Sequence, residues 1–142
     1  MKKFASFILL LAFVLQVAGQ SEVNYKDTWS NSDVDKLASQ IANTPFPKQK
    51  LDLVRTAVDT ATLGFNAMQT KKILKSFAIS SYMADAVQVM DEHILGMTAK
   101  DVAEVLEVLK FEQHRLRALE ALRFTITDED NKYDVLTVFS TK

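Results

Sequence analysis

The sequence contains no cysteine and few prolines and glycines. Without a thiol there can be no disulfide framework, no thiolate nucleophile, no cysteine metal site and no lipobox-type lipid anchor. Only 2 prolines and 3 glycines occur in 142 residues, so the frequent turn signals that an all-β fold needs are missing. A chain of this length can bury one apolar core, and we therefore expect a single helical domain.

Only one long apolar run is present, and it lies at the N-terminus. Two lysines precede an apolar stretch over residues 4–14, and Val17 and Gly19 are small residues that suit a signal peptidase site. Residues 1–19 are therefore predicted to be a signal peptide cleaved after Gly19, which leaves Gln20 as the N-terminus of a secreted or periplasmic protein. A membrane-spanning helix needs about 20 apolar residues, so we expect no stable membrane insertion after cleavage.

The mature chain lacks a strong excess of either charge. Cleavage after Gly19 leaves 15 Lys and Arg against 18 Asp and Glu, which gives a formal net charge of −3. Nucleic-acid binding favours a net basic domain with clustered charge, so no nucleic-acid partner is expected. Two smaller basic groups could still meet a local acidic partner. They are Lys71, Lys72 and Lys75, and Arg115, Arg117 and Arg123.

Apolar residues recur at intervals of three and four over most of the chain. This spacing is typical of amphipathic helices. It predicts about seven short helices over 33–43, 47–60, 67–76, 81–94, 99–109, 113–123 and 128–138. Short corners between them require neighbouring helices to run antiparallel. Residues 20–31 show no clear period and are expected to form a linker or N-terminal arm before one domain over 32–142.

Helix-start signals are spaced almost evenly along the chain. In a capping box, an N-cap side chain and the residue three places later satisfy each other's backbone N–H groups. Four are predicted: Ser32 with Asp35, Asn66 with Gln69, Thr98 with Asp101, and Thr127 with Asp130. These starts are 34, 32 and 29 residues apart, which indicates an internal repeat.

Apolar positions follow nearly the same offset. Three sets are Leu74, Leu106 and Leu136; Phe77, Leu109 and Phe139; and Val54, Val87 and Leu119. We therefore predict an all-α fold of stacked antiparallel hairpins with a repeat of about 30–33 residues, forming either a compact bundle or a short α-solenoid. Stacking is required because a single hairpin cannot bury its apolar face alone.

The corner and helix-start motifs resemble those of a known family. Its members carry a Gln near one helix start, an L-x-x-F corner, a K-L-x-x-L helix and a D-x-x-N-x-x-x-L-x-x-F ending. Residues at positions of that kind are Gln69, Leu74, Phe77, Leu116, Leu119, Asp128, Asn131, Val135 and Phe139, with Arg115 where Lys is usual. Over about residues 45–142 the chain thus resembles domain-of-unknown-function family 4476. The resemblance implies a small exported helical domain and supplies no reaction, ligand or catalytic residue.

No residue pattern predicts catalysis, a metal or a cofactor. His93 and His114 are 21 residues apart and have no companion ligands at zinc-site spacing. The acidic run from Asp128 to Asn131 lacks the glycine and the glutamate that an EF-hand requires, and acidic residues also suit the first turn of a helix. Neither a serine triad nor a glycine-rich phosphate loop is present. We therefore predict that the protein is not an enzyme.

The leading functional hypothesis is an exported, non-catalytic interaction module that binds another protein, because stacked hairpins present extended surfaces. The alternative is a carrier of a small apolar ligand between helices, suggested by adaptable methionines and by phenylalanines. The phenylalanines at helix corners are interpreted as packing between repeats. They are Phe46, Phe65, Phe77, Phe111, Phe124 and Phe139. The candidate interaction surface comprises Tyr25 and Trp29, outside the array, with Lys71, Lys72, Lys75, Arg115 and Arg117.

Overall fold

A computed structural model describes residues 27–139 of the chain. Its α-helices are α2 (Asn31–Ala42), α3 (Pro47–Thr60), α4 (Ala67–Lys75), α5 (Ser80–Met90), α6 (Ala99–Leu106) and α7 (Glu112–Leu122). Three 3-10 segments complete it: η1 (Asp91–His93), η2 (Arg123–Thr125) and η3 (Glu129–Phe139). The predicted all-α fold is confirmed. The predicted signal peptide and Tyr25 lie outside the described residues.

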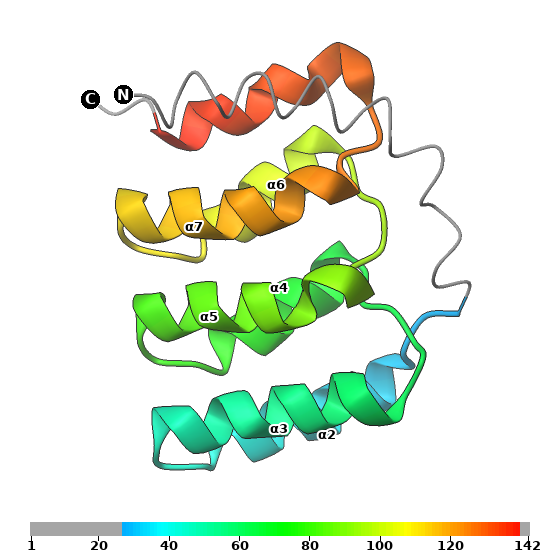
Figure 1. Ribbon diagram of the computed structural model, residues 1–142, viewed down its shortest axis with the longest axis vertical. Helices are drawn as coiled ribbons and strands as arrows, with labels where there is room; N and C mark the ends of the chain where they lie inside the picture. Colours follow the sequence, from blue (N-terminus) through cyan, green and yellow to red (C-terminus); the bar gives the residue numbers. More distant parts are fainter. Residues whose placement is uncertain (1–26, 140–142) are drawn as a thin grey trace.

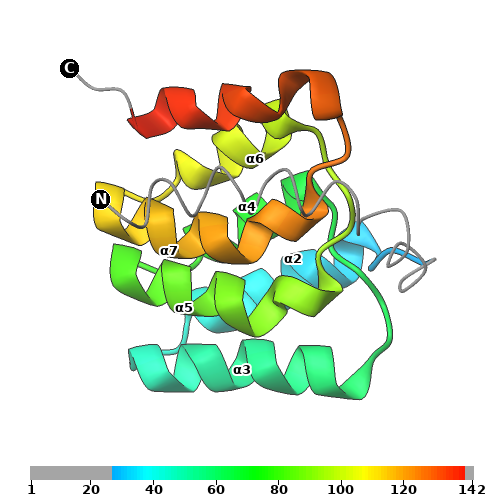
Figure 2. The same ribbon diagram turned by 45° about the horizontal axis from the view of Figure 1, so that its top comes forward.

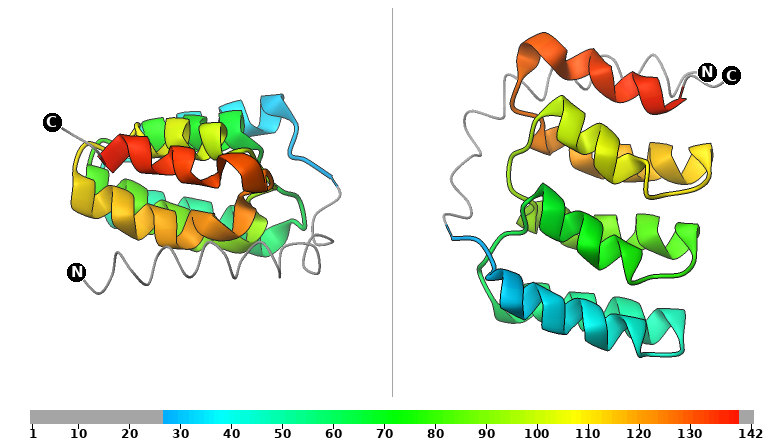
Figure 3. Two further views of the ribbon diagram at one scale, coloured as in Figure 1. Left: turned by 90° about the horizontal axis from the view of Figure 1, so that it is seen from above. Right: turned by 180° about the vertical axis from the view of Figure 1, so that it is seen from behind.

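The helices stack in two layers (Figure 1). One layer contains α2, α4, α6 and η3, and the other contains α3, α5 and α7; neighbours within each layer pack side by side. Figures 2 and 3 show the same two layers from other directions. Each hairpin contributes one helix to each layer, and η3 adds a final half-unit. Because the first hairpin and η3 lie at opposite ends of the stack, the arrangement is a short open α-solenoid.

Polar side chains cap the starts of α2, α4 and α6. The predicted capping box of Asn66 and Gln69 is confirmed, with both reciprocal hydrogen bonds present. Of the capping box predicted for Thr98 and Asp101, the half formed by Thr98 is confirmed, because its hydroxyl accepts the N–H of Asp101 at 3.1 Å. Each of the helices α2, α4 and α6 therefore begins with a side-chain oxygen that accepts a hydrogen bond from a free backbone N–H group.

The predicted cap of the first helix is wrong by two residues. Ser30, and not Ser32, accepts the N–H of Asp33 at 3.0 Å, and α2 begins at Asn31. Both serines have an aspartate three places later, so the local signal is ambiguous. A tertiary contact accompanies the earlier start: the N–H of Trp29 donates to the carbonyl of Gly64 at 3.0 Å.

The last predicted helix also differs from the structure. Residues Glu129–Phe139 form a 3-10 helix where an α-helix was expected over 128–138. The capping box predicted at Thr127 is wrong, because the helix begins at Glu129 and Asp128 is the residue before it. The Thr127 hydroxyl donates to the carbonyl of Met97 at 3.3 Å. Asp128 accepts the N–H of Ala99 at 2.7 Å. Its carboxylate thus lies at the start of α6, where the helix dipole favours negative charge.

Backbone hydrogen bonds join the segments that connect successive hairpins, along one edge of the stack. Three isolated parallel bridges pair Thr28 with Gly64, Phe65 with Ile94, and Met97 with Ile126. For example, the N–H of Phe65 donates to the carbonyl of His93 at 2.8 Å, and the N–H of Leu95 donates to that of Phe65 at 2.9 Å. These bridges could not be predicted from the sequence, since single-residue pairs leave no periodic signal.

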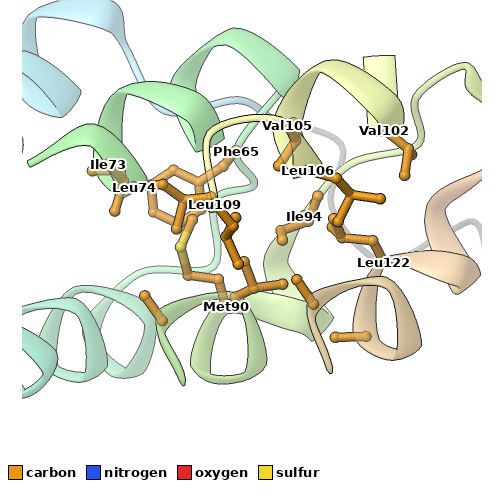
Figure 4. Packing of buried hydrophobic residues seen from close by; sticks show 14 of the residues in the cluster. Phe65, Ile73, Leu74, Met90, Ile94, Val102, Val105, Leu106, Leu109 and Leu122 are labelled. Carbon is orange, nitrogen blue, oxygen red and sulfur yellow. The ribbon is translucent and has the colours of Figure 1, made fainter. Parts of the chain in front are cut away.

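A continuous apolar core fills the space between the layers (Figure 4). Corresponding positions in successive hairpins have similar burial. Val54, Val87 and Leu119 are fully buried on α3, α5 and α7, and Leu74 and Leu106 are fully buried on α4 and α6. Leu136 of η3 is only partly buried, and Val135 beside it is buried instead. The end of the stack therefore departs from the repeat by one residue.

Within residues 27–139, no helix has both the length and the apolar character needed to cross a membrane.

Candidate functional site

The tips of the three hairpins lie along the edge of the stack opposite the connecting segments (Figure 1). Here α3, α5 and α7 begin, and their N-cap residues are Phe46, Ile79 and Phe111. In each case the N-cap carbonyl accepts the N–H of the fourth helical residue at 3.0 or 3.1 Å. The three residues therefore occupy equivalent positions, and we call them the tip row.

All three side chains of the tip row are large, apolar and exposed. Phe46 is 61% exposed, Ile79 is 48% exposed and Phe111 is 56% exposed. Single apolar residues on a surface are common and require no explanation. Three at equivalent positions along one edge form a pattern, because each successive hairpin adds one more.

The tip row also leaves three helix starts without side-chain caps. No side chain of Phe46, Ile79 or Phe111 caps its own helix, whereas α2, α4 and α6 are all capped. Apolar residues are among the least favourable N-caps, and Ser, Thr, Asn or Asp would add about 0.5–2 kcal/mol each. Positions that break a local stability rule of this kind are typical of functional sites.

A small hollow lies between the first and second tips. It has a volume of about 90 Å³. Its lining residues are Pro45, Pro47, Lys50, Phe77, Ala78, Ile79 and Tyr82. Because a cavity of about 150 Å³ holds one benzene molecule, this hollow has room for no more than one apolar side chain. Pockets for drug-sized ligands measure about 300–1,000 Å³, so the hollow is too small to enclose such a ligand.

Two inward-pointing cations hold neighbouring hairpins together near the tips. The buried Lys50 ammonium donates to the carbonyl of Ile41 at 2.9 Å and to that of Ser76 at 3.3 Å. These carbonyls lie at the ends of α2 and α4, where a positive charge is favourable. Lys50 therefore helps to fix the first tip relative to the second.

Arg115 occupies the corresponding place in α7, as the fourth residue of its helix. Its Nε donates to the carbonyl of Leu109 and its Nη1 to that of Val138, both at 2.8 Å. The structure thus gives this partly buried residue, predicted as part of an interaction surface, two contacts within the chain.

Unpaired lysines surround the first two tips. Lys48 follows Phe46 on α3, and Lys75 ends α4; both are exposed, and neither forms an ion pair with the residues that the structure describes. Residues 42–51 and 69–84 contain no Asp or Glu. The third tip is mixed, since it carries Lys110, Glu107 and Glu112. The first two tips therefore form the more positive part of this edge.

Three other predicted surface residues form ion pairs between neighbouring hairpins. Lys72 pairs with Asp35, Lys71 pairs with Glu104 at 3.5 Å, and Arg117 pairs with Asp85. Exposed ion pairs contribute about 0–1 kcal/mol each. Lys71 and Lys72 lie on α4, whereas Arg117 lies on α7 in the other layer. The structure therefore does not gather the predicted residues into one patch.

Trp29 lies at the connecting edge and contacts the stack. Its ring stacks on that of Phe65, with centroids 5.4 Å apart and an interplanar angle of 12°. Its carbonyl accepts a hydrogen bond of 2.7 Å from the side chain of Gln69. Trp29, predicted as part of an interaction surface, is therefore partly buried against the core of the stack.

The histidines lie apart. Nδ1 of His114 is 2.9 Å from the hydroxyl of Ser80, and its ring meets that of Phe111 edge-on with centroids 5.6 Å apart. The backbone of His93 belongs to the connecting edge, where its carbonyl accepts the N–H of Phe65. Among residues 27–139, no three His, Asp or Glu side chains come together in a way that could hold a metal ion.

The tip row was not predicted from the sequence, because the corner phenylalanines resembled packing residues. Phe65 and Phe77 are buried as expected, and Phe139 packs against the core. That interpretation is wrong for Phe46, Phe111 and Phe124, which are half exposed or more. One local signal could have identified the first of them: Pro47 marks the first helical residue, so Phe46 occupies a position that normally holds a capping residue.

Comparison with known proteins identifies one family. A family model described as domain of unknown function (DUF4476) matches residues 28–96 and also residues 81–142. The same model fits two overlapping parts of the chain, which is expected of successive units that resemble each other. No curated protein and no solved structure matches the chain.

Proposed function

The chain belongs to the DUF4476 family, and from this premise we propose that it is an exported, non-catalytic module that binds another protein through the tip row. The observation that carries the proposal is the combination of exposure and missing caps at Phe46, Ile79 and Phe111. Each position exposes a large apolar side chain where a small polar one would stabilise the helix. Contact with a partner would explain why these N-cap positions hold apolar residues.

The shape of the edge favours a protein partner over a small molecule. The three tips follow one another along the stack (Figure 1), and stacked repeats present extended surfaces of the kind that bind proteins. Large apolar residues are typical anchors at the centre of protein interfaces. The alternative of an apolar-ligand carrier has less support, because the hollow between the first two tips measures only about 90 Å³.

Export is the second part of the proposal, and it rests on the N-terminal residues alone. The lysine pair, the apolar stretch over residues 4–14 and the small residue Gly19 support cleavage by a signal peptidase. The mature protein would then begin at Gln20 in the periplasm or outside the cell. The absence of a recognisable catalytic pattern supports a binding role.

Site-specific photo-crosslinking tests this proposal in the native host. A photoreactive phenylalanine analogue at position 46, 79 or 111 should form covalent adducts with a protein, because these side chains would be covered by the partner. The matched control is position 68, where Met68 is 73% exposed on α4 at the connecting edge. The mass of the purified product also tests export, since cleavage after Gly19 leaves Gln20 first.

Adducts at the tip row with none at position 68 would support the proposal. If the three tip positions gave no protein adduct, or gave no more than position 68, the proposed binding surface would be wrong. A product that retained residues 1–19 would contradict export alone.

A further inference from the structure

We propose that the partner segment held at the tip row is acidic and inserts one apolar side chain into the hollow between the first and second tips. This inference rests on the proposed function and specifies the partner's chemistry. It depends on two independent features of the same place: the hollow itself, and the unpaired positive charge around it.

The hollow is formed by rigid and well-anchored residues. Pro45 and Pro47 contribute two of its walls, and proline rings fix the backbone of the first tip. Lys50 ties this tip to the carbonyl of Ser76 in the second tip at 3.3 Å. Because the hollow exists before binding, a partner side chain would enter it without first ordering the loops. Ile79 belongs both to the hollow and to the tip row, which makes the two surfaces continuous.

The positive charge around the hollow favours an acidic partner. Lys48 and Lys75 are exposed beside the hollow and lack ion-pair partners among the described residues. The buried ammonium of Lys50 adds a further positive charge behind them, and it donates to two carbonyl oxygens. Residues 42–51 and 69–84 supply no carboxylate to balance these lysines. A segment that carries Asp or Glu next to an apolar residue would complement this surface.

A protein segment fits this edge better than an anionic membrane. A membrane-binding surface presents a continuous apolar strip with basic residues along its length. Here the third tip places Glu107 and Glu112 beside Phe111, so a lipid surface that covered the whole tip row would meet two carboxylates. A peptide can instead place its acidic residues at the first two tips and a neutral or basic residue at the third.

The test is selection from a phage-displayed library of random peptides on the immobilised mature chain. The enriched peptides should share a Leu, Ile, Met or Phe with Asp or Glu within a few residues of it. A synthetic copy of the most enriched peptide should bind about tenfold more weakly to the double variant Lys48→Glu/Lys75→Glu, and also to Ile79→Ser.

Lys100→Glu is the matched charge control. Lys100 is also exposed and also lacks an ion-pair partner in the described part of the chain, but it lies near the start of α6 at the connecting edge. Peptide affinity should stay the same in this variant. Ile79→Ser should remain folded, because serine is a favourable N-cap residue, and circular dichroism would check this.

The remaining outcomes separate this inference from the proposed function. Enriched peptides that are neutral or basic, but that still depend on Ile79, would overturn the acidic partner and leave the tip row as a binding surface. Peptides that bind Ile79→Ser as well as the wild type, or no enrichment at all, would overturn the inference, and the crosslinking result would then decide the proposed function. Charge-dependent binding to phosphatidylglycerol vesicles, or self-association lost in Ile79→Ser, would replace the partner with a membrane or a second copy and overturn it too.

Discussion

Leu106→Ala is expected to lower the free energy of unfolding by about 2–5 kcal/mol. Leu106 is fully buried on α6. Figure 4 shows it near Ile94, in the segment that connects the second and third hairpins, and near Leu122 of α7. Truncation removes apolar contacts with both layers and leaves a cavity that the packed helices cannot close. Because small domains are stable by only about 5–15 kcal/mol, the urea midpoint should shift clearly.

The matched comparison is Leu136→Ala on η3. Leu136 lies at the position that the repeat assigns to Leu106, but it is only partly buried at the end of the stack. Its truncation should cost less than half as much, because less apolar surface returns to water. If the two variants lost the same free energy of unfolding, the claim that Leu136 packs less tightly than Leu106 would be wrong.

Gln69→Leu is expected to destabilise the protein by about 2–4 kcal/mol. Gln69 is buried, and its amide oxygen accepts the N–H of Asn66 at 3.0 Å. Its amide nitrogen donates to the carbonyl of Trp29 at 2.7 Å and to the side chain of Asn31 at 2.9 Å. Leucine has a similar size but would leave these polar groups without partners, and each partly buried orphan costs about 1–3 kcal/mol.

Gln49→Leu is the control for this prediction. Gln49 is the third residue of α3, as Gln69 is the third residue of α4. It is exposed and follows an N-cap, Phe46, that cannot form a capping box. Its replacement should change the free energy of unfolding by about 0.5 kcal/mol or less. If thermal denaturation showed similar losses for both glutamines, the link from Gln69 to the first hairpin would be wrong.

The helices that could be predicted are those whose start and apolar spacing agree. The span 47–60 matches α3 at both ends, because Pro47 marks the start and Leu51, Val54 and Val58 follow at helical intervals. The predicted helix starts are wrong where tertiary contacts decide between two local capping signals. Two Ser-x-x-Asp signals overlap before α2, and the acidic Asp128 binds the start of α6 instead of its own helix.

The candidate site could be predicted from the sequence less well than the helices. The carboxylates that pair with Lys72, Lys71 and Arg117 lie 37, 33 and 32 residues away. Those separations are close to one repeat, so only the stacking of hairpins brings the charges together. For Phe46 and Phe111, apolarity alone does not indicate whether a corner residue points into the core or into solvent.

The central claim is that the tip row contributes little to packing, which leaves its side chains available for contact with another protein. The most direct test is the free energy of unfolding of the triple variant Phe46→Ser/Ile79→Ser/Phe111→Ser, measured in urea. Each substitution removes about 1 kcal/mol of half-exposed apolar contact and supplies an N-cap of similar value. The account therefore predicts a free energy within about 2 kcal/mol of the wild type, and a loss of more than about 4 kcal/mol, typical of core residues, would contradict it.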